Sequence, residues 1–157
     1  MSIECFLIEP IWEPYSAEAA AAGFHNKYED WRPGENVCIA GWRRVDTGEE
    51  RKHNNEFGVG AMWFAYWQVR NRDWSNETGP HLHVRCPNGP DGTRDWDIDS
   101  RCSNCALPND KLHRCWIRHG EPPNITVDKS GLTCSAGAGS IALPKWHGFL
   151  RGGRLVE

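Results

Sequence analysis

Long apolar runs are missing from this sequence, and so is a recognisable leader peptide. The longest apolar stretches, such as residues 58–66, fall far short of the ~20 residues that a membrane-spanning helix needs. The first ten residues have no basic region, and Glu4 interrupts their apolar stretch, so they do not have the pattern of a signal peptide. The sequence therefore predicts a chain with no membrane partner that folds inside the cell that makes it.

An excess of positive charge is also missing, since the net charge is −3. Proteins that bind duplex nucleic acid usually present a strongly basic face. The composition gives no support for such a partner.

The seven cysteines are an odd number, and without a secretion signal they predict reduced thiols rather than a disulfide framework. The 157 residues fit one domain, 1–157, which is large enough to fold without metal or disulfides. Nine tryptophans, five phenylalanines and three tyrosines supply much of the apolar surface, and we interpret them mainly as core and sheet packing.

Short apolar segments separated by turn residues predict a fold dominated by strands. Ser16 and the alanines after it predict one short N-terminal helix, with Ser16 as its N-cap. The expected strands cover residues 3–8, 37–45, 59–69, 81–85, 94–98, 115–118, 125–128, 132–134, 148–151 and 154–156. The fold class is therefore mainly β (α+β): a compact antiparallel sheet or barrel with one short N-terminal helix.

Three of these segments carry specific expectations. Residues 59–69 are apolar on both faces, which indicates a central strand covered on each side. Gly152 and Gly153 separate two short apolar runs, which is typical of a tight hairpin. Asp95, Asp97 and Asp99 alternate with Trp96 and Ile98, so the carboxylates are expected on an exposed face.

The clearest chemical motif is a cysteine and histidine cluster. Cys102 and Cys105 form a Cys-x2-Cys pair, which can chelate a single zinc ion, and His113 and Cys115 can supply two further ligands from one face. Four such ligands make a closed, tetrahedral structural site, so zinc is the expected cofactor. Cys86 or Cys134 can replace His113 in this set, and buried reduced thiols beside a loop histidine are the simpler interpretation.

A second metal set uses histidines on strands. His81 and His83 share a strand face, and with His147 they define a metal-dependent enzyme, a hydrolase or a cupin-like oxygenase. The expected neighbouring carboxylate is missing before Asp91, so a polar strand face is the simpler interpretation.

A third hypothesis is a zinc-ribbon-like module that binds single-stranded nucleic acid through tryptophan stacking. It requires six basic side chains to converge on one face. These are Lys111, Arg114, Arg118, Lys145, Arg151 and Arg154.

A set of short segments in the C-terminal third forms a recognisable pattern: Ser103-Asn104-Cys105, residues 113–123, residues 127–129, residues 134–141 and residues 147–150. This pattern resembles small uncharacterised proteins encoded by actinobacterial phages. It implies a phage or prophage origin and synthesis in the cytoplasm of a bacterial host, and it carries no established activity.

No catalytic arrangement stands out, and the many aromatic residues suit a rigid scaffold. We therefore expect a non-enzymatic domain that binds another protein, either as a virion accessory component or as a host-acting factor, with homo-oligomerisation as a further option. In a virion, Cys105 and Cys115 can form a disulfide instead of binding a metal.

Overall fold

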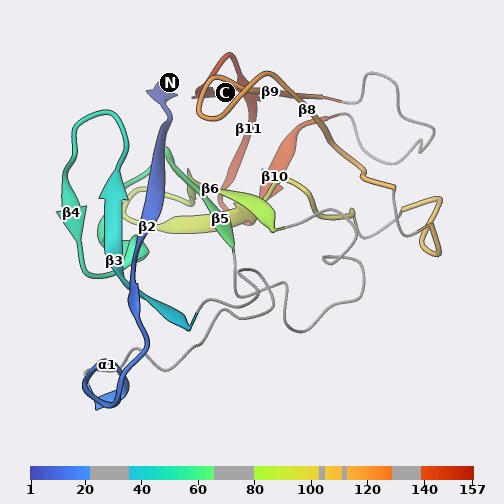
Figure 1. Cartoon of the computed structure of the whole chain (residues 1–157). Helices are drawn as coiled ribbons and strands as arrows, with labels where there is room; N and C mark the ends of the chain where they lie inside the picture. Colours follow the sequence, from blue (N-terminus) through green and yellow to red (C-terminus); the bar gives the residue numbers. More distant parts are fainter. Residues whose placement is uncertain (22–35, 66–79, 103–104, 111–112, 129–138) are drawn as a thin grey trace.

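The computed structural model describes residues 1–21, 36–65, 80–102, 105–110, 113–128 and 139–157 (Figure 1). Half of this part of the chain, 50%, is in strands, which form three mostly antiparallel sheets. The predicted mainly β fold with one short N-terminal helix is confirmed. Of the two forms expected, the described residues adopt open sheets and not a barrel.

The largest sheet has six strands in the order β4-β3-β2-β5-β6-β7. Its members are β2 (Phe6–Pro14), β3 (Val37–Arg44), β4 (Glu50–Arg51), β5 (Ala61–Ala65), β6 (His81–Pro87) and β7 (Thr93–Asp97). All neighbouring strands are antiparallel except β2 and β5, which are parallel.

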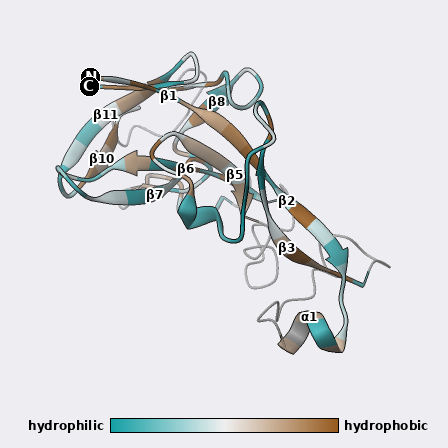
Figure 2. Ribbon diagram, turned by 90° about the vertical axis from the view of Figure 1, so that its left-hand side faces the viewer, coloured by the Kyte–Doolittle hydropathy of each residue, from teal (hydrophilic) through white to brown (hydrophobic). Residues whose placement is uncertain are grey.

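A four-stranded sheet joins the two ends of the chain. It contains β1 (Ser2–Glu4), β12 (Arg154–Val156), β11 (Trp146–Arg151) and β10 (Ile141–Leu143), in that order. The hairpin at Gly152 and Gly153 is confirmed, and both glycines have positive φ angles. Ser2 lies opposite Val156, so the two ends lie side by side (Figure 2).

Three small elements complete the described chain. β8 (Ile117–His119) pairs with β9 (Thr126–Asp128), and a 3-10 turn covers Asn54–Glu56. The helix α1 (Ala17–Ala21) begins as predicted, because the Ser16 hydroxyl accepts a hydrogen bond from the Ala19 N–H at 3.0 Å. Within the described chain, no helix has the length and apolar character that a membrane crossing requires.

The main core is built from both large sheets and β9. Its members include Met62, Leu82, Val84, Ile98, Val127, Ile141, Leu150 and Leu155. A second core covers the other face of β5, where Ala61 and Trp63 pack with Ile8, Trp42 and Phe57. The prediction of a central strand with two covered faces is thus confirmed over residues 61–65, while residues 66–69 lie outside the described chain.

Several predicted strand limits were wrong, and the strand expected at residues 3–8 is divided at Cys5 into β1 and β2. β2 does not end before Pro10 but continues through it to Pro14. It pairs with β5 only at Phe6 and Leu7, and a strand tolerates proline where its ring nitrogen faces no neighbouring strand. The strand expected at residues 115–118 begins only at Ile117, and the one expected at 132–134 lies outside the described residues.

Candidate metal centre

The predicted cysteine and histidine cluster lies between β7 and β8, in a segment with little regular structure. The Ile98 side chain is buried in the main core, and its N–H donates to the Leu82 carbonyl at 2.9 Å, which anchors the start of this segment beside β6. A turn follows, in which the Cys105 N–H donates to the Cys102 carbonyl at 3.2 Å. This turn carries Cys105 back toward the residues that precede β8.

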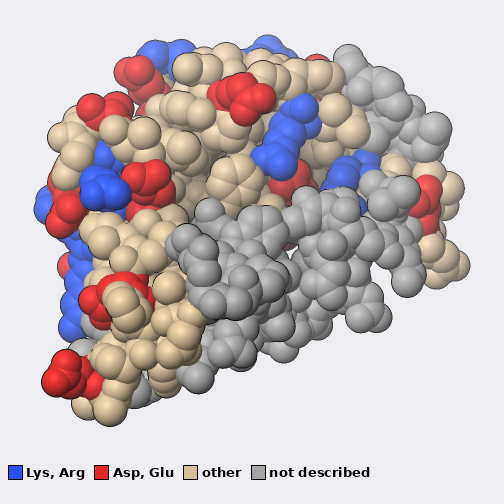
Figure 3. Space-filling view, in the orientation of Figure 1, with Lys and Arg blue, Asp and Glu red and all other residues tan. Residues whose placement is uncertain are grey.

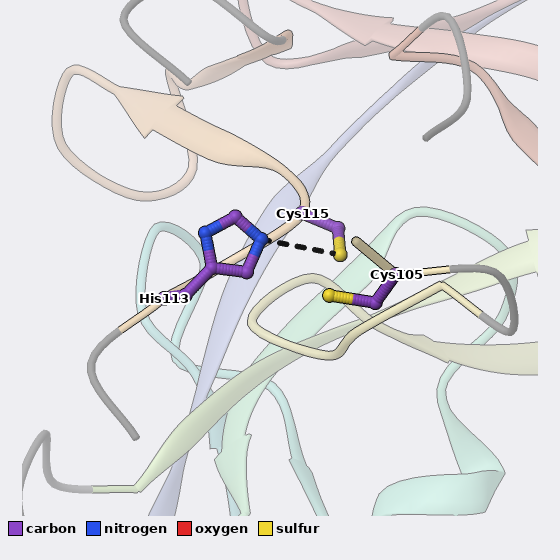
Figure 4. Close-up of side chains that lie close together, drawn as sticks. All are labelled: Cys105, His113 and Cys115. Atoms are coloured by element: carbon purple, nitrogen blue, oxygen red, sulfur yellow. Dashed lines mark hydrogen bonds between the residues drawn. The ribbon is translucent and has the colours of Figure 1, made fainter. Parts of the chain in front are cut away.

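Three side chains converge at this point (Figure 4). One ligand atom from each of Cys105, His113 and Cys115 lies within 4.8 Å of the others. His113 and Cys115 are buried, with exposed fractions of 8% and 1%, whereas Cys105 is half-buried. Figure 4 shows the Cys105 sulfur entering from the loop after β7, while the other two side chains come from the segment leading into β8.

The spacing of these atoms suits a tetrahedral metal ion. His113 Nε2 lies 3.6 Å from Cys115 Sγ. Zinc bonds of about 2.3 Å to sulfur and about 2.0 Å to nitrogen, at a tetrahedral angle, separate the two ligand atoms by about 3.5 Å. The residues present therefore fit a zinc ion in both donor type and separation.

Cys102, the fourth predicted ligand, packs against Cys115 together with Cys105 and Trp116. It is not part of the group of three whose ligand atoms all lie within 4.8 Å of one another. The structure thus brings Cys105, His113 and Cys115 together as the motif suggested and places Cys102 beside them.

Burial is the main electrostatic influence on the Cys115 thiol. It raises the pKa of Cys115 above its ordinary value, and hydrogen bonding with the neighbouring Cys102 and Cys105 modifies that shift. A buried thiol of this kind stays protonated at neutral pH unless a cation stabilises the thiolate. The Cys105 sulfur accepts a hydrogen bond from the Leu107 N–H at 3.4 Å.

Two residues that the sequence analysis missed hold the loop in place. The Arg101 guanidinium donates to the carbonyls of Leu107 at 2.7 Å and of Asp110. Asp110 in turn accepts the His113 N–H, at its carbonyl and at its carboxylate. Aspartate commonly begins a turn, so the local sequence offered a signal for the role of Asp110. Nothing in the sequence around Arg101 indicates its role.

Trp116 connects the centre to the main core. Its ring meets the edge of Trp96 at 5.3 Å between centroids and at 88°, and its Nε1–H donates to the Ser140 carbonyl at 3.3 Å. Because Trp116 directly follows Cys115, any shift of that ligand is transmitted to the packing between the sheets.

The histidines of the alternative metal set occupy separate places. His81 and His83 lie on β6, and both face Asp97: His81 Nδ1 donates to its carboxylate at 2.8 Å, and His83 Nε2 lies 3.9 Å from it. His147 lies on the exposed side of β11, in contact with Phe149. Among the described residues, these three histidines do not form a group with metal-ligand spacing.

The expectation of an exposed acidic face was only partly correct. Antiparallel pairing sets Asp97 opposite His83, and the side chains of Asp97 and Asp99 are 19% and 13% exposed. Asp99 accepts the Leu82 N–H at 2.8 Å. The carboxylate that the sequence analysis missed near His81 is therefore supplied by the neighbouring strand β7.

The other candidate cysteines and basic residues lie only partly within the described chain. Cys86 is buried in the main core, where burial raises the pKa of its thiol, and Cys134 and Lys111 lie outside the described residues. Arg118 pairs with Asp99 at 3.4 Å, and Arg154 contacts Ser2. Figure 3 shows basic and acidic side chains interspersed on the face it presents.

No protein-family model matches the chain, and no curated protein or solved structure matches it either. The interpretation of the site therefore rests on its own geometry.

Proposed function

We propose that this chain is a non-enzymatic interaction domain whose irregular segment between β7 and β8 is stabilised by one structural zinc ion. The convergence of Cys105, His113 and Cys115 is the observation that carries this proposal. Sulfur and imidazole ligands at these separations favour zinc over magnesium or calcium, which prefer oxygen.

Cys102 is the fourth ligand in this proposal. A structural zinc site uses four protein ligands, whereas a catalytic site keeps one position open for water or substrate. Cys102 packs against Cys115, and its carbonyl accepts the Cys105 N–H, so it is the cysteine beside the group that would complete the set. The burial of His113 and Cys115 also suits a closed site that water does not enter.

The bound ion would cross-link the two segments on either side of the centre, which hydrogen bonds alone join only in part. The segments 98–110 and 113–116 contain turns but no strand or helix in their described residues. Zinc held by ligands from both segments adds its binding free energy to the stability of this region. Because Trp116 follows Cys115 and contacts Trp96, fixing Cys115 also restrains this contact with the main core.

The exposed side of β11 is the surface that we assign to a partner protein. His147 and Arg151 flank Phe149. The ring centroids of His147 and Phe149 lie 6.2 Å apart, and the Arg151 guanidinium carbon lies 4.3 Å from the Phe149 centroid. Arg151 also lies opposite Arg154 on β12, whose guanidinium lies 4.0 Å from the Glu4 carboxylate. Aromatic residues and arginine are enriched in protein interfaces, and the exposed Arg151 suits a partner surface with an acidic group.

The resemblance to phage-encoded proteins extends this proposal to the setting. It indicates a bacterial host cytoplasm, or a virion, as the place where the partner is found. A virion component or a component of the host machinery is the class of partner that follows.

Metal analysis of the purified full chain, expressed without a histidine tag, tests the zinc centre. We expect one zinc per chain by elemental mass spectrometry, with X-ray absorption showing three sulfur ligands and one nitrogen ligand. A zinc site with two sulfurs and a bound water would contradict the closed structural role. No metal together with seven reactive thiols, the full cysteine count, would remove the zinc centre altogether.

A binding assay tests the interaction surface. Once a partner is isolated, Phe149→Ala is expected to weaken its binding at least about tenfold, as for a residue central to an interface. Val45→Ala, which changes an exposed apolar residue elsewhere, is the matched control and should leave binding unchanged. Equal affinities for the two variants would place the interface on another surface.

A further inference from the structure

We infer that Cys105 and Cys115 form an oxidation site, in which a peroxide-class oxidant converts the two metal-binding thiols into a disulfide and releases the metal. This inference deepens the proposed zinc centre and rests on it for the release step. The disulfide step itself depends only on the two sulfurs.

The positions of the two sulfurs carry this inference. Cys105 Sγ and Cys115 Sγ lie within 4.8 Å of each other, although ten peptide bonds separate the residues in the sequence. A disulfide requires a sulfur separation of about 2.0 Å, which rotation of the two side chains and a small shift of the loop can provide. None of the six described cysteines is in a disulfide.

The two cysteines differ in a way that assigns their roles. Cys105 is half-buried, so a small oxidant can reach its sulfur. Cys115 is only 1% exposed, which protects it from direct attack. Cys105 is therefore the residue that is oxidised first, and Cys115 is the residue that resolves the product.

The chemistry balances with hydrogen peroxide as the oxidant. The Cys105 thiolate attacks one peroxide oxygen, the O–O bond breaks, and a sulfenic acid and one hydroxide form. The Cys115 sulfur then attacks the Cys105 sulfur and the S–O bond breaks, which forms a disulfide and releases a second hydroxide when Cys115 is a thiolate, or water when it is a thiol. Two electrons pass from the sulfurs to the peroxide, and a zinc ion that has lost two thiolate ligands dissociates.

The fold suits such an exchange because the disulfide joins the same two segments that the metal joins. Cys105 lies on the loop after β7, and Cys115 lies on the segment leading into β8 (Figure 4). Cys115, the neighbour of Trp116, is therefore linked to the loop after β7 both in the metal-bound state and in the disulfide state. Its ring, which contacts Trp96, provides a fluorescence signal that reports the change.

The first test treats the zinc-loaded full chain with a small excess of hydrogen peroxide. We expect one zinc released per chain, measured with a metallochromic indicator, the loss of two thiols, and a Cys105–Cys115 disulfide in the peptide map. Dithiothreitol should restore both thiols and zinc uptake. Cys38→Ala removes a buried thiol on β3 outside the centre and should behave as the unsubstituted chain does. Oxidation without zinc release, or a disulfide that includes Cys102, would overturn the inference.

The second test does not depend on zinc. In the metal-free Cys115→Ser variant the resolving thiol is absent, so dimedone should trap a sulfenic acid on Cys105. In Cys105→Ser, the yield of trapped product should fall at least tenfold. Equal trapping in both variants, or trapping mainly on Cys102, would overturn the assignment. A chain that binds no zinc but forms the Cys105–Cys115 disulfide would contradict the proposed function and leave the oxidation site supported.

Discussion

His113 Nε2 lies 3.6 Å from Cys115 Sγ, although the two residues belong to a segment that forms neither a helix nor a strand. The two side chains come from the segment leading into β8, and both point toward Cys105, which lies on the loop after β7 (Figure 4). The pair therefore faces Cys105 across the centre, and several measurable consequences follow from this arrangement.

Removing Cys115 should abolish the stabilisation by zinc. At free zinc about a thousandfold above the dissociation constant, bound zinc contributes about 4 kcal/mol to the free energy of unfolding. Cys115→Ser should lose this contribution, and a chelator should destabilise the unsubstituted chain but leave the variant almost unchanged. Urea unfolding with and without chelator measures both effects. Equal sensitivity of the two proteins to chelator would contradict the prediction.

Replacing Arg101 should weaken metal binding without removing a ligand. Its guanidinium holds the carbonyls of Leu107 and Asp110, and loss of such supporting contacts typically costs 10–100-fold in metal affinity. We expect Arg101→Met to show a loss in this range in a competition titration against a chromophoric chelator. Arg94→Met, at an exposed position on β7, is the control and should bind zinc as the unsubstituted chain does. Matching affinities for both variants would remove Arg101 from the support of the site.

The pH dependence of stability should contain a contribution from His83. Burial lowers the pKa of His83, although Asp97 opposes this effect. In the unfolded chain the imidazole titrates near 6.5, so between the lowered pKa and that value the unfolded state binds more protons than the folded state. The free energy of unfolding should therefore fall as the pH drops through this window. His83→Gln should flatten the fall over the same window in urea unfolding, and an unchanged slope would contradict the prediction.

Gly148→Ala should be strongly destabilising. A Cβ at this position would lie 2.4 Å from both Trp146 Cζ2 and the Val156 carbonyl oxygen, so the sheet and the core must both shift. Overpacking of this kind typically costs 1–3 kcal/mol, and we expect a loss of at least about 2 kcal/mol. Gly58→Ala is the control, because its Cβ would meet nothing within 4 Å; its effect should stay within about 0.5 kcal/mol. Thermal unfolding of both variants provides the comparison.

The sequence by itself determined much of the β fold. Some features depend on only a few neighbouring residues, so they could be predicted from the sequence: the alternation of apolar residues, the Ser16 cap and the Gly152–Gly153 turn. The two covered faces of residues 61–65 were also readable, because both faces of that strand are apolar. The continuation of β2 through Pro10 could not be predicted from the sequence, since it depends on how far the neighbouring strand β5 extends.

The candidate centre divides in the same way. The spacing of Cys105, His113 and Cys115 along the chain identified them as candidate ligands, because short loops keep such residues near each other. Only the tertiary structure decided that Arg101 holds the loop, that Trp116 joins the centre to the core, and that Asp97 faces His81 and His83. The pairing of β1 with β12 is the extreme case, since it joins residues at opposite ends of the chain. These contacts arise from packing between segments distant in sequence, and no local pattern specifies which segments meet.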